Sequence, residues 1–519
     1  MRSLRSSAFI PLPSSLHFNL TSRRDKPWFK TTRCISLIWA GPGVSYSRPA
    51  INQISSPIKT VTIHFVLGCI ALGAVFDISP VAAAQTRTLR IVTYNIEADT
   101  DGYTAARPGL IIPSGGGTVQ QGGVLEGIGE EIVGNDPAQP LDILALEETT
   151  TNPITVVPIV SGLNSFYGVA GMYSNSTYQA TQFGGSANNG SGNGPNAMVY
   201  NAKTLQLLAS VPVDPPGGIG NLGSASGEYR EVMRYEFAPA GMTPTATNEF
   251  YIYVSHYKAS TGSNNEAYRN DEARIIRNDE AINLPANARV LYVGDYNVTS
   301  SGEASYQTIL SNTAPNGIHQ GQGIDPMNPT GASNINWANS NAPPSILAME
   351  TESSTYLRYR DDLQVMTTNV YSGAAGGLAL VPGTYQGFGN NGTTPYFGSV
   401  NSGSNTALNS DLAPGAPISA AQLYLDLTTA SDHLPVVADY TIPITVPAPV
   451  FQSVTGTGGT VTFTWSAVVS AVYQLQYRTN LAQGNWSNLG SAITATNAVM
   501  SAADSIGPDP QRFYRLLVP

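Results

Sequence analysis

Four apolar, strand-like segments that each run into polar residues place the strongest constraint on the fold of this 519-residue chain. Their residues either alternate in polarity, as in a half-buried strand, or form a short apolar run, as in a buried strand. The segments are 89–95 (LRIVTYN), 141–146 (LDILAL), 250–255 (FYIYVS) and 289–293 (RVLYV). Strand ends that meet at one edge of a sheet build a polar pocket, so the pattern predicts a sheet-based domain with a site at that edge.

One helix is predicted between the third and fourth of these strands. Residues 266–284 place apolar side chains on one side and charged side chains opposite, and Pro285 ends the pattern. The apolar side consists of Ala267, Ile275, Ile276 and Ile282. Segments rich in Gly, Asn and Pro predict three long surface loops, at 99–123, 184–196 and 312–344.

An apolar segment near the N-terminus has the pattern of a secretory signal. Residues 61–76 follow Lys59 and lead into 81–84 (VAAA), a small-residue sequence of the kind that signal peptidase cleaves. We therefore expect 59–84 to be a signal peptide and the mature protein to be secreted, either extracellular or periplasmic. A transmembrane anchor is the alternative, but the run is shorter than the roughly 20 residues of a bilayer span. No stable anchor is expected after processing.

Residues 1–58 form an N-terminal extension in front of this signal, where a signal peptide would normally begin the protein. We hypothesise that the start is misassigned. No second Met occurs between Met1 and Ala84, so the true start would be a non-ATG codon near Ile58 or Val61. N-terminal sequencing of the exported protein that found Met1 intact would refute this hypothesis.

The charge of the chain argues against a protein that coats nucleic acid. Nine of the 25 basic residues but only two of the 35 acidic ones precede residue 85, which leaves the rest with a net charge of −17. A polyanion held by non-specific electrostatics requires a basic surface. Both cysteines, Cys34 and Cys69, also precede this point, so the mature protein is expected to have no disulfide, zinc thiolate or cysteine nucleophile.

A second, smaller domain is predicted at the C-terminus. A proline-punctuated segment predicts a linker at 442–450, and period-two alternation beyond it predicts a small β-sandwich at 451–519. This sandwich resembles the fibronectin-like modules at the C-termini of secreted bacterial enzymes, and it is a candidate for binding a cell surface or a polymer. We interpret its aromatic residues as core, with a ligand platform as the alternative; these are Trp465, Tyr477, Trp486 and Tyr514.

Five strand ends in the larger part of the chain deliver a carboxylate, a carboxamide or an imidazole. A single histidine in such a place is more often a hydrogen-bonded structural residue than a catalytic one, so the set carries the argument. Hard metal ions and phosphates suit a pocket built from such groups. The five are Asn95, Glu148, His256, the sequence 294–297 (GDYN) and the pair Asp432-His433.

Six motifs in order resemble the endonuclease/exonuclease/phosphatase superfamily, which includes pancreatic-type deoxyribonucleases, apurinic endonucleases, sphingomyelinases and inositol phosphatases. The motifs are LRIVTYN, LDILALEE, YVSHYKA, VGDYN, RYRDDLQV and SDHLPV. The resemblance covers roughly residues 87–441 and implies a catalytic domain at 85–441. It implies an α+β fold, a four-layered sandwich of two mainly antiparallel β-sheets flanked by helices, and hydrolysis of phosphate esters.

The resemblance also implies a metal site. Asn95 and Glu148 would bind a catalytic Mg²⁺ or Mn²⁺, with Ca²⁺ as a further candidate. Glu97 would be a further ligand, and Asp432 would bind the metal or support its ligands. Oxygen ligands that leave positions open for water and phosphate are those that Mg²⁺ prefers, and a bound metal neutralises a phosphodiester that otherwise repels the nucleophile.

Five residues would carry the chemistry. Asp295 and Asn297 would position the attacking water and the phosphoryl oxygens. His433 would act as general base or stabilise the transition state, oriented by Asp362. His256 matches the histidine that deoxyribonuclease-like members use to protonate the leaving oxygen. A carboxylate beside an imidazole fixes its tautomer and raises its basicity, which suits the pairing of Asp362 with His433.

Two positions depart from the family pattern. Glu147 replaces the usual glutamine before the metal glutamate, and it either binds a second cation or faces away, because neighbouring strand residues point to opposite faces. We favour the second interpretation. Asp361 replaces an apolar residue, so either Asp361 or Asp362 could orient His433, and the spacing to the following strand favours Asp362.

A nuclease-like phosphodiesterase is the preferred substrate prediction, with nucleic acid as the partner. A sphingomyelinase-like phospholipase or a phosphomonoesterase is the alternative, since all three use such a site. A phospholipase requires an exposed apolar loop, and Trp337 is the only tryptophan in the three long loops. An extracellular binding protein with an inactive fold is the non-enzyme alternative, and the presence of Glu148 and His433 argues against it. Cations available for a nucleic acid are Arg230, Arg234, Lys258, Arg269, Arg274 and Arg358.

Overall fold

The computed structural model describes most of the chain after residue 82, with gaps. The described residues are 83–98, 110, 123–130, 139–180, 194–213, 230–312, 322–374, 376–409, 412–413, 415–416, 418–480 and 485–519. The predicted extension and all but the last two residues of the predicted signal peptide lie outside them. Among the described helices, none is both long and apolar enough to cross a membrane.

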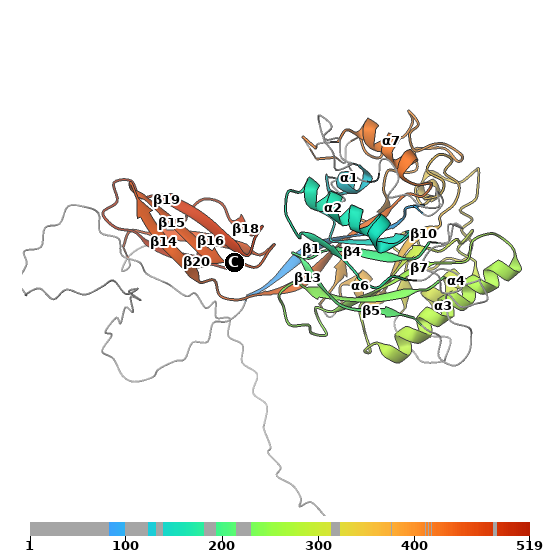
Figure 1. Ribbon diagram of the computed structural model, residues 1–519, viewed down its shortest axis with the longest axis horizontal. Coiled ribbons are helices and arrows are strands. Elements are labelled where there is room, and N and C mark those ends of the chain that lie inside the picture. Colours follow the sequence, from blue (N-terminus) through green and yellow to red (C-terminus); the bar gives the residue numbers. More distant parts are fainter. Residues whose placement is uncertain are drawn as a thin grey trace, which may run out of the picture.

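Two mixed β-sheets form the centre of the larger domain (Figure 1). Two pairings, β1 with β2 and β7 with β8, are parallel, and the other pairings in these sheets are antiparallel. The first sheet has the order β11 (Ala379–Leu380), β13 (Val436–Val446), β1 (Ala83–Asn95), β2 (Ile143–Glu147), β4 (Ala197–Asn201) and β3 (Tyr173–Asn175), with β12 (Gln386–Gly387) also paired to β13. The second has the order β5 (Leu205–Pro212), β6 (Met233–Pro239), β7 (Phe250–His256), β8 (Val290–Asp295), β10 (Asp362–Thr367) and β9 (Gly323–Ile324).

Helices cover the outer faces of both sheets, which confirms the predicted four-layered α+β sandwich. One hydrophobic cluster lies between the first sheet and its helices, a second between the two sheets, and a third between the second sheet and its helices. The first sheet is covered by α1 (Val124–Glu130), α2 (Val157–Phe166) and α7 (Ala420–Ala430), and the second by α3 (Ser263–Asn283) and α4 (Ala304–Leu310). Short helical segments are a π-helical turn (Asn152–Val156), α5 (Pro344–Leu347) and α6 (Thr368–Ser372).

Strand β2 shows why the sequence predicts these layers. Its side chains alternate between two apolar environments, so every residue of the strand is buried. Leu144 and Leu146 pack toward the helices, whereas Ile143 and Ala145 pack between the sheets. Glu147 has the same parity as the second pair and therefore points into the space between the sheets.

The predicted helix is α3, which begins three residues earlier than the pattern suggested. Ile275 and Ile276 are buried as expected, but Ala267 is exposed and Ile282 is 52% exposed, so the assignment of these two residues to the buried apolar side was wrong. Ion pairs fill the rest of the buried face. Arg269 contacts Glu303 at 2.5 Å, and Arg277 contacts Glu280 at 2.7 Å. Apolar periodicity alone misjudges a helix whose buried face contains paired charges.

The C-terminal residues form the predicted small β-sandwich. Its core contains Trp465 and Tyr514, with Tyr477 at the periphery, whereas Trp486 lies outside the core between the guanidinium groups of Arg478 and Arg515. One sheet comprises β14 (Phe451–Thr457), β15 (Thr460–Ser466) and β19 (Val499–Ser505). The other comprises β17 (Ser487–Asn488), β16 (Val472–Arg478), β18 (Ile493–Thr494) and β20 (Phe513–Leu517).

A two-stranded ribbon joins the two domains (Figure 1). Strands β1 and β13 pair from Thr93↔Val436 to Ala83↔Val446, so β13 continues into the segment predicted as a linker. Ile444 and Val446 belong to the core of the smaller domain. The same ribbon therefore ends near Asn95 at one extremity and contributes to the second core at the other.

Candidate active site

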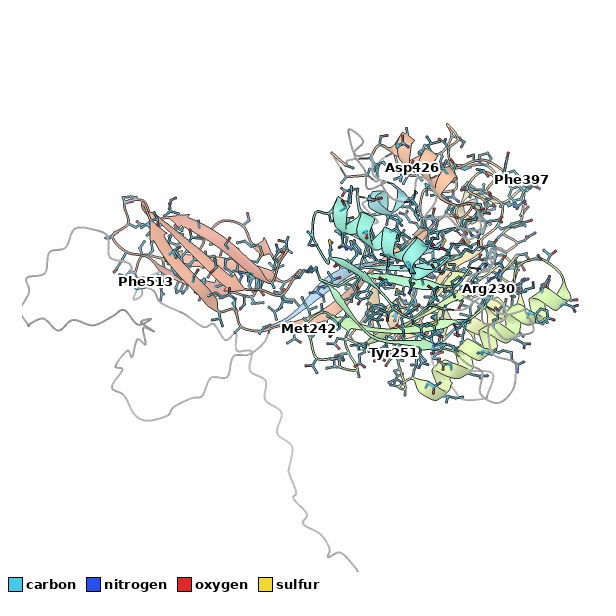
Figure 2. All side chains as sticks on the ribbon, in the orientation of Figure 1. Arg230, Met242, Tyr251, Phe397, Asp426 and Phe513 are labelled. Atoms are coloured by element: carbon cyan, nitrogen blue, oxygen red, sulfur yellow. The ribbon has the colours of Figure 1, made fainter. Side chains whose placement is uncertain are left out.

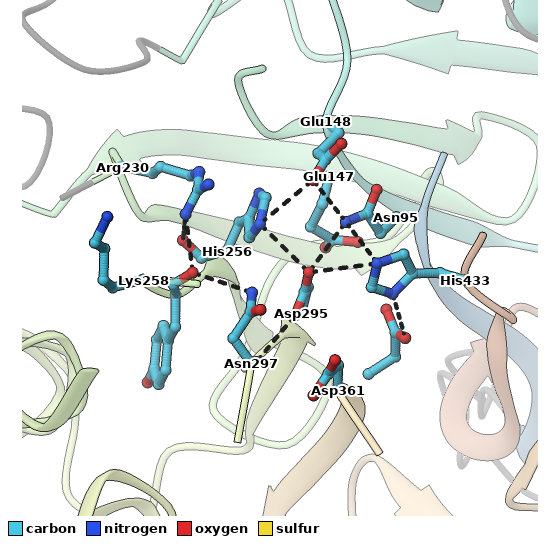
Figure 3. Close-up of polar contacts among 12 residues, drawn as sticks. Asn95, Glu147, Glu148, Arg230, His256, Lys258, Asp295, Asn297, Asp361 and His433 are labelled. Carbon is cyan, nitrogen blue, oxygen red and sulfur yellow. Dashed lines mark hydrogen bonds and ion pairs between the residues drawn. The ribbon is translucent and has the colours of Figure 1, made fainter. Parts of the chain in front are cut away.

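Six strand ends bring the predicted site residues to one edge of the two sheets (Figure 3). The parallel pairs place Asn95 beside Glu147 and His256 beside Asp295. The antiparallel pairing of β8 with β10 adds a third register, in which Asp362 lies opposite Asp295. Glu148 directly follows β2, and His433 lies three residues before the start of β13.

A group of two carboxylates and one imidazole forms the centre of this site. Nε2 of His256 lies 3.3 Å from Oδ2 of Asp295 and 3.6 Å from Oε1 of Glu148. One potential ligand atom from each of the three residues lies within 4.8 Å of the others. Nδ2 of Asn95 donates to both carboxylates, at 3.0 Å to Asp295 and 3.2 Å to Glu148. This oxygen-rich donor set, with Glu148 only half-buried, fits a hard divalent cation.

His433 and Asp362 form a buried hydrogen-bonded pair beside this group. Nδ1 of His433 lies 2.8 Å from Oδ2 of Asp362, and its Nε2 faces the centre, 3.8 Å from Oδ2 of Asp295. The contact selects Asp362 over Asp361 as the acid that orients the imidazole. The ring is thereby fixed with one nitrogen bound and the other directed at the reaction centre.

The surroundings shift the pKa values of the two site histidines in opposite directions. Burial disfavours the charged form of His433, but the carboxylates of Asp362 and Asp295 outweigh it and raise its pKa well above the ordinary value. Burial, with a smaller effect from Arg230, lowers the pKa of His256 well below that value. Burial raises the pKa of Asp362 to about 6, against the opposing charge of His433. The site therefore combines a charged and a neutral imidazole near pH 7.

Asn297 is fixed by the turn that follows β8. Its backbone N–H donates to Oδ1 of Asp295 at 2.9 Å, and its Nδ2 donates to the carbonyl of Tyr257 at 3.2 Å. Arg230 donates to the same carbonyl at 2.8 Å and so lies beside this turn (Figure 3). Gly294 makes the approach possible, because a Cβ there would lie 1.9 Å from the carbonyl oxygen of Ser255 and its φ is +131°.

Glu97 and Asp432 lie beside the central group without joining its three converging atoms. Oε2 of Glu97 accepts from the backbone N–H of Asp432 at 3.1 Å. The Asp432 side chain is 45% exposed, and its Oδ1 lies 3.7 Å from Nε2 of His433. Their predicted roles at the metal stay predictions, whereas Asp295 and His256 take the places nearest to Glu148.

Glu147 lies in the interior beneath the site, not in solvent. Its side chain is fully buried and Oε1 accepts from Thr93 at 3.1 Å, while Oε2 has no hydrogen-bond partner within the described ranges. Burial, together with the charges of Asp362 and Asp295, raises its pKa well above the ordinary value. A neutral carboxyl group in this position explains how the chain tolerates an acid there.

Ser431 was not among the predicted site residues, yet it joins two of the strands that build the site. Its hydroxyl donates to the carbonyl of Asn95 at 2.7 Å and accepts from the backbone N–H of His433 at 3.0 Å. It thereby connects the end of β1 to the start of β13. The only signal is its position directly before Asp432-His433. A serine at that position is too common in turns to be informative.

Three site residues adopt left-handed backbone conformations, which cost energy for residues other than glycine. The φ angles are +47° at Glu97, +52° at Glu148 and +50° at Asn297. Each follows a strand end directly or within two residues. The turns therefore aim these side chains at the site at the expense of local strain, as is usual where function fixes a geometry.

The whole chain matches no known family profile and no curated protein. It is similar to the human Nocturnin catalytic domain with bound sulfate, at 15% identity and a TM-score of 0.36 over 69% of this chain and 97% of that one. It is also similar to ANGEL2, a 2′,3′-cyclic phosphatase, at 13% identity and a TM-score of 0.36 over 70% of this chain and 98% of that one. A third similar structure is an endonuclease/exonuclease/phosphatase family protein from Bacteroides thetaiotaomicron. Its identity is 11% and its TM-score is 0.33, over 69% of this chain and 97% of that one. At values this low, the similarities assign the chain neither an activity nor a substrate.

Proposed function

We propose that the protein is a divalent-metal-dependent hydrolase of phosphodiester bonds, of the endonuclease/exonuclease/phosphatase type. The observation that carries the proposal is the convergence of Glu148, His256 and Asp295 within 4.8 Å, next to the His433–Asp362 pair. Carboxylates suit the metal, and an oriented imidazole suits the phosphate. The site has both within one buried edge of the sheets.

Glu148 and Asp295 are the residues that would hold the metal, with Asn95 and His256 beside them. A bound Mg²⁺ or Mn²⁺ supplies Lewis-acid neutralisation of the phosphate and activates water. Asn95 donates hydrogen bonds to both carboxylates and so fixes their orientation. Mg²⁺ fits better than a soft metal, because oxygen atoms dominate the donor set.

His433 supports the phosphate during the reaction. With a raised pKa it is charged near neutral pH, so its Nε2–H donates to a phosphoryl oxygen as negative charge develops there. Of the two roles implied by the motifs, this favours transition-state stabilisation over general base. His256 is neutral, so a role as acid at the leaving oxygen would require it to take up a proton first.

Among the substrate alternatives, the phospholipase interpretation loses its one supporting residue. Trp337 is fully buried and its ring lies 5.3 Å from the guanidinium carbon of Arg360, so it is not an exposed membrane anchor. Figure 3 shows Arg230 and Lys258 on the His256 side of the site, where they suit the phosphates that flank a scissile bond. A nuclease-like substrate therefore remains the proposal.

A substrate panel tests this proposal. Full-length protein is assayed on plasmid DNA, RNA, sphingomyelin and bis-p-nitrophenyl phosphate, each with Mg²⁺, Mn²⁺, Ca²⁺ or EDTA. We expect metal-dependent cleavage of a nucleic acid and of bis-p-nitrophenyl phosphate. Folded protein that cleaves no phosphate ester would refute the enzyme, and cleavage of sphingomyelin alone would refute the nuclease.

Secretion is a separate part of the proposal, and it rests on the sequence of residues 59–84. Fractionation of producing cells, with mass spectrometry of the N-terminus, tests it. We expect a mature chain that begins close to Gln85 outside the cytoplasm, and a full-length chain confined to the cytoplasm would contradict export.

A further inference from the structure

Two aromatic side chains stand out from the surface of the larger domain. Tyr356 is 62% exposed and Phe397 is 54% exposed, although burying an aromatic ring is strongly favourable. The ring of Phe397 packs edge-on against that of Tyr396, at 4.5 Å between centroids. Phe397 also has a φ of +62°, which is strained for a bulky residue. Folding alone explains neither the exposure nor the strain.

Backbone hydrogen bonds attach both residues to the active site. The N–H of Ser354 donates to the carbonyl of Asp432 at 2.7 Å, and Glu352 forms a β-bridge with His433. From the same segment, the N–H of Leu357 donates to the carbonyl of Gly398 at 3.0 Å, and the carbonyl of Leu357 accepts from the N–H of Phe397 at 2.8 Å. Figure 2 shows Phe397 and Arg230 at the same end of the larger domain, away from the smaller one. The two rings are thus fixed to the segment that holds His433.

A cation, Arg358, lies two residues after Tyr356 in the same segment. The guanidinium carbon of Arg358 is 4.8 Å from the centre of the Tyr359 ring, and Nη2 pairs with Glu352 at 3.1 Å. The Arg358 side chain is 38% exposed, so it can reach a ligand from this position. Arginine among exposed aromatic rings is the composition of surfaces that bind single-stranded nucleic acid through phosphate contacts and base stacking.

The surface formed by the segments of Tyr356, Arg358 and Phe397 favours nucleic-acid bases over a lipid as its ligand. Insertion into a bilayer takes a substantial apolar area, and the two segments that carry the rings are otherwise polar, TESSTYLRY at 351–359 and NGTTPYFGS at 391–399. Stacking needs only the faces of one or two rings.

We propose that Tyr356 and Phe397 form a stacking platform for unpaired bases of a nucleic-acid strand next to the scissile phosphate. Arg358 would contact the phosphate backbone of that strand. This inference rests on the proposed phosphodiesterase function and extends it to a preference for single-stranded substrate. Because stacking accepts every base, the platform selects unpaired strands without selecting a sequence.

Binding of matched oligonucleotides tests the platform. Fluorescence anisotropy is measured on full-length protein carrying His433→Ala, with Mg²⁺, using an eight-nucleotide thymidine strand and an abasic strand of equal length. We expect about tenfold tighter binding of the strand with bases for each ring that stacks. Tyr356→Ser and Phe397→Gly together should remove that preference, and glycine suits the left-handed backbone at 397.

Tyr371→Ala is the matched control, since Tyr371 is an exposed tyrosine in α6, beyond the opposite end of β10 from Asp362. It should leave the preference for bases unchanged. The inference is overturned if unsubstituted rings give no preference for bases, if the preference survives removal of both rings, or if their removal instead abolishes binding to sphingomyelin vesicles. Hydrolysis of bis-p-nitrophenyl phosphate by the unsubstituted protein reports separately on the proposed function.

Discussion

Replacement of Asp362 by asparagine breaks the pair that orients His433 while it preserves the shape of the side chain. The carboxylate is fully buried and lies 2.8 Å from Nδ1 of His433, whose side chain is 9% exposed. Removal of one partner from a buried ion pair costs about 3–5 kcal/mol. Since each 1.36 kcal/mol is a factor of ten in rate, Asp362→Asn should lower kcat by roughly 10²- to 10⁴-fold if that loss falls on the transition state.

The assay is release of p-nitrophenolate from bis-p-nitrophenyl phosphate under saturating Mg²⁺, across a range of pH. Without the charge of Asp362 the pKa of His433 falls, so the limb of the profile that reports loss of its proton should move to lower pH. Asp361→Asn is the matched control, because Asp361 is also buried but does not contact the imidazole. A wild-type kcat in Asp362→Asn, or an equal or larger loss in Asp361→Asn, would refute the assignment.

Three stability predictions follow from buried positions, and each is measured by urea unfolding. Burial raises the pKa of Asp142 to about 6, so its folded carboxyl keeps a proton that the unfolded chain releases near pH 4; stability should fall by about 3 kcal/mol as pH rises from about 4 to 6, and Asp142→Asn should lose this dependence. Gly294→Ala should cost about 3–5 kcal/mol through its clash with Ser255, against about 1 kcal/mol for Gly241→Ala, where φ is +72° but space is open. Asp439→Ala should cost about 3–5 kcal/mol by leaving Arg90 buried and unpaired at its 2.8 Å contact, against less than about 1 kcal/mol for Asp509→Ala, whose side chain is 30% exposed. The first argument would be contradicted if the stability of the wild type and of Asp142→Asn depended on pH in the same way. The other two would be contradicted if both variants of a pair lost the same free energy of unfolding.

Much of the larger domain could be predicted because its strands are short apolar runs that end in polar residues. LDILAL becomes β2, and LRIVTYN becomes the end of β1. Once two such strands are parallel neighbours, their polar ends must meet, which is why Asn95 and Glu148 lie together. The choice of Asp362 over Asp361 followed from the spacing to the following strand, and β10 indeed begins at Asp362.

The sequence could not show which side chains long-range packing would bury. Trp337 lies in a polar segment, yet it packs beside Tyr306 and Arg360, residues from other parts of the chain. Trp486 was interpreted as a core residue of the smaller domain, but its ring lies outside the core and contacts the guanidinium groups of Arg478 and Arg515. Local patterns contain no information on such contacts, because the partners come from distant segments.

The central claim is that Glu148 holds a divalent metal needed for phosphodiester hydrolysis. The most direct test is calorimetric titration of full-length protein with Mn²⁺, in the wild type, in Glu148→Gln and in the adjacent Glu147→Gln. Glu147 is buried with a raised pKa, so a neutral glutamine closely resembles it. We predict that Glu148→Gln weakens Mn²⁺ binding at least about tenfold and abolishes metal-dependent hydrolysis, whereas Glu147→Gln retains both. Unchanged Mn²⁺ affinity in Glu148→Gln, or hydrolysis that persists in EDTA, would contradict the claim.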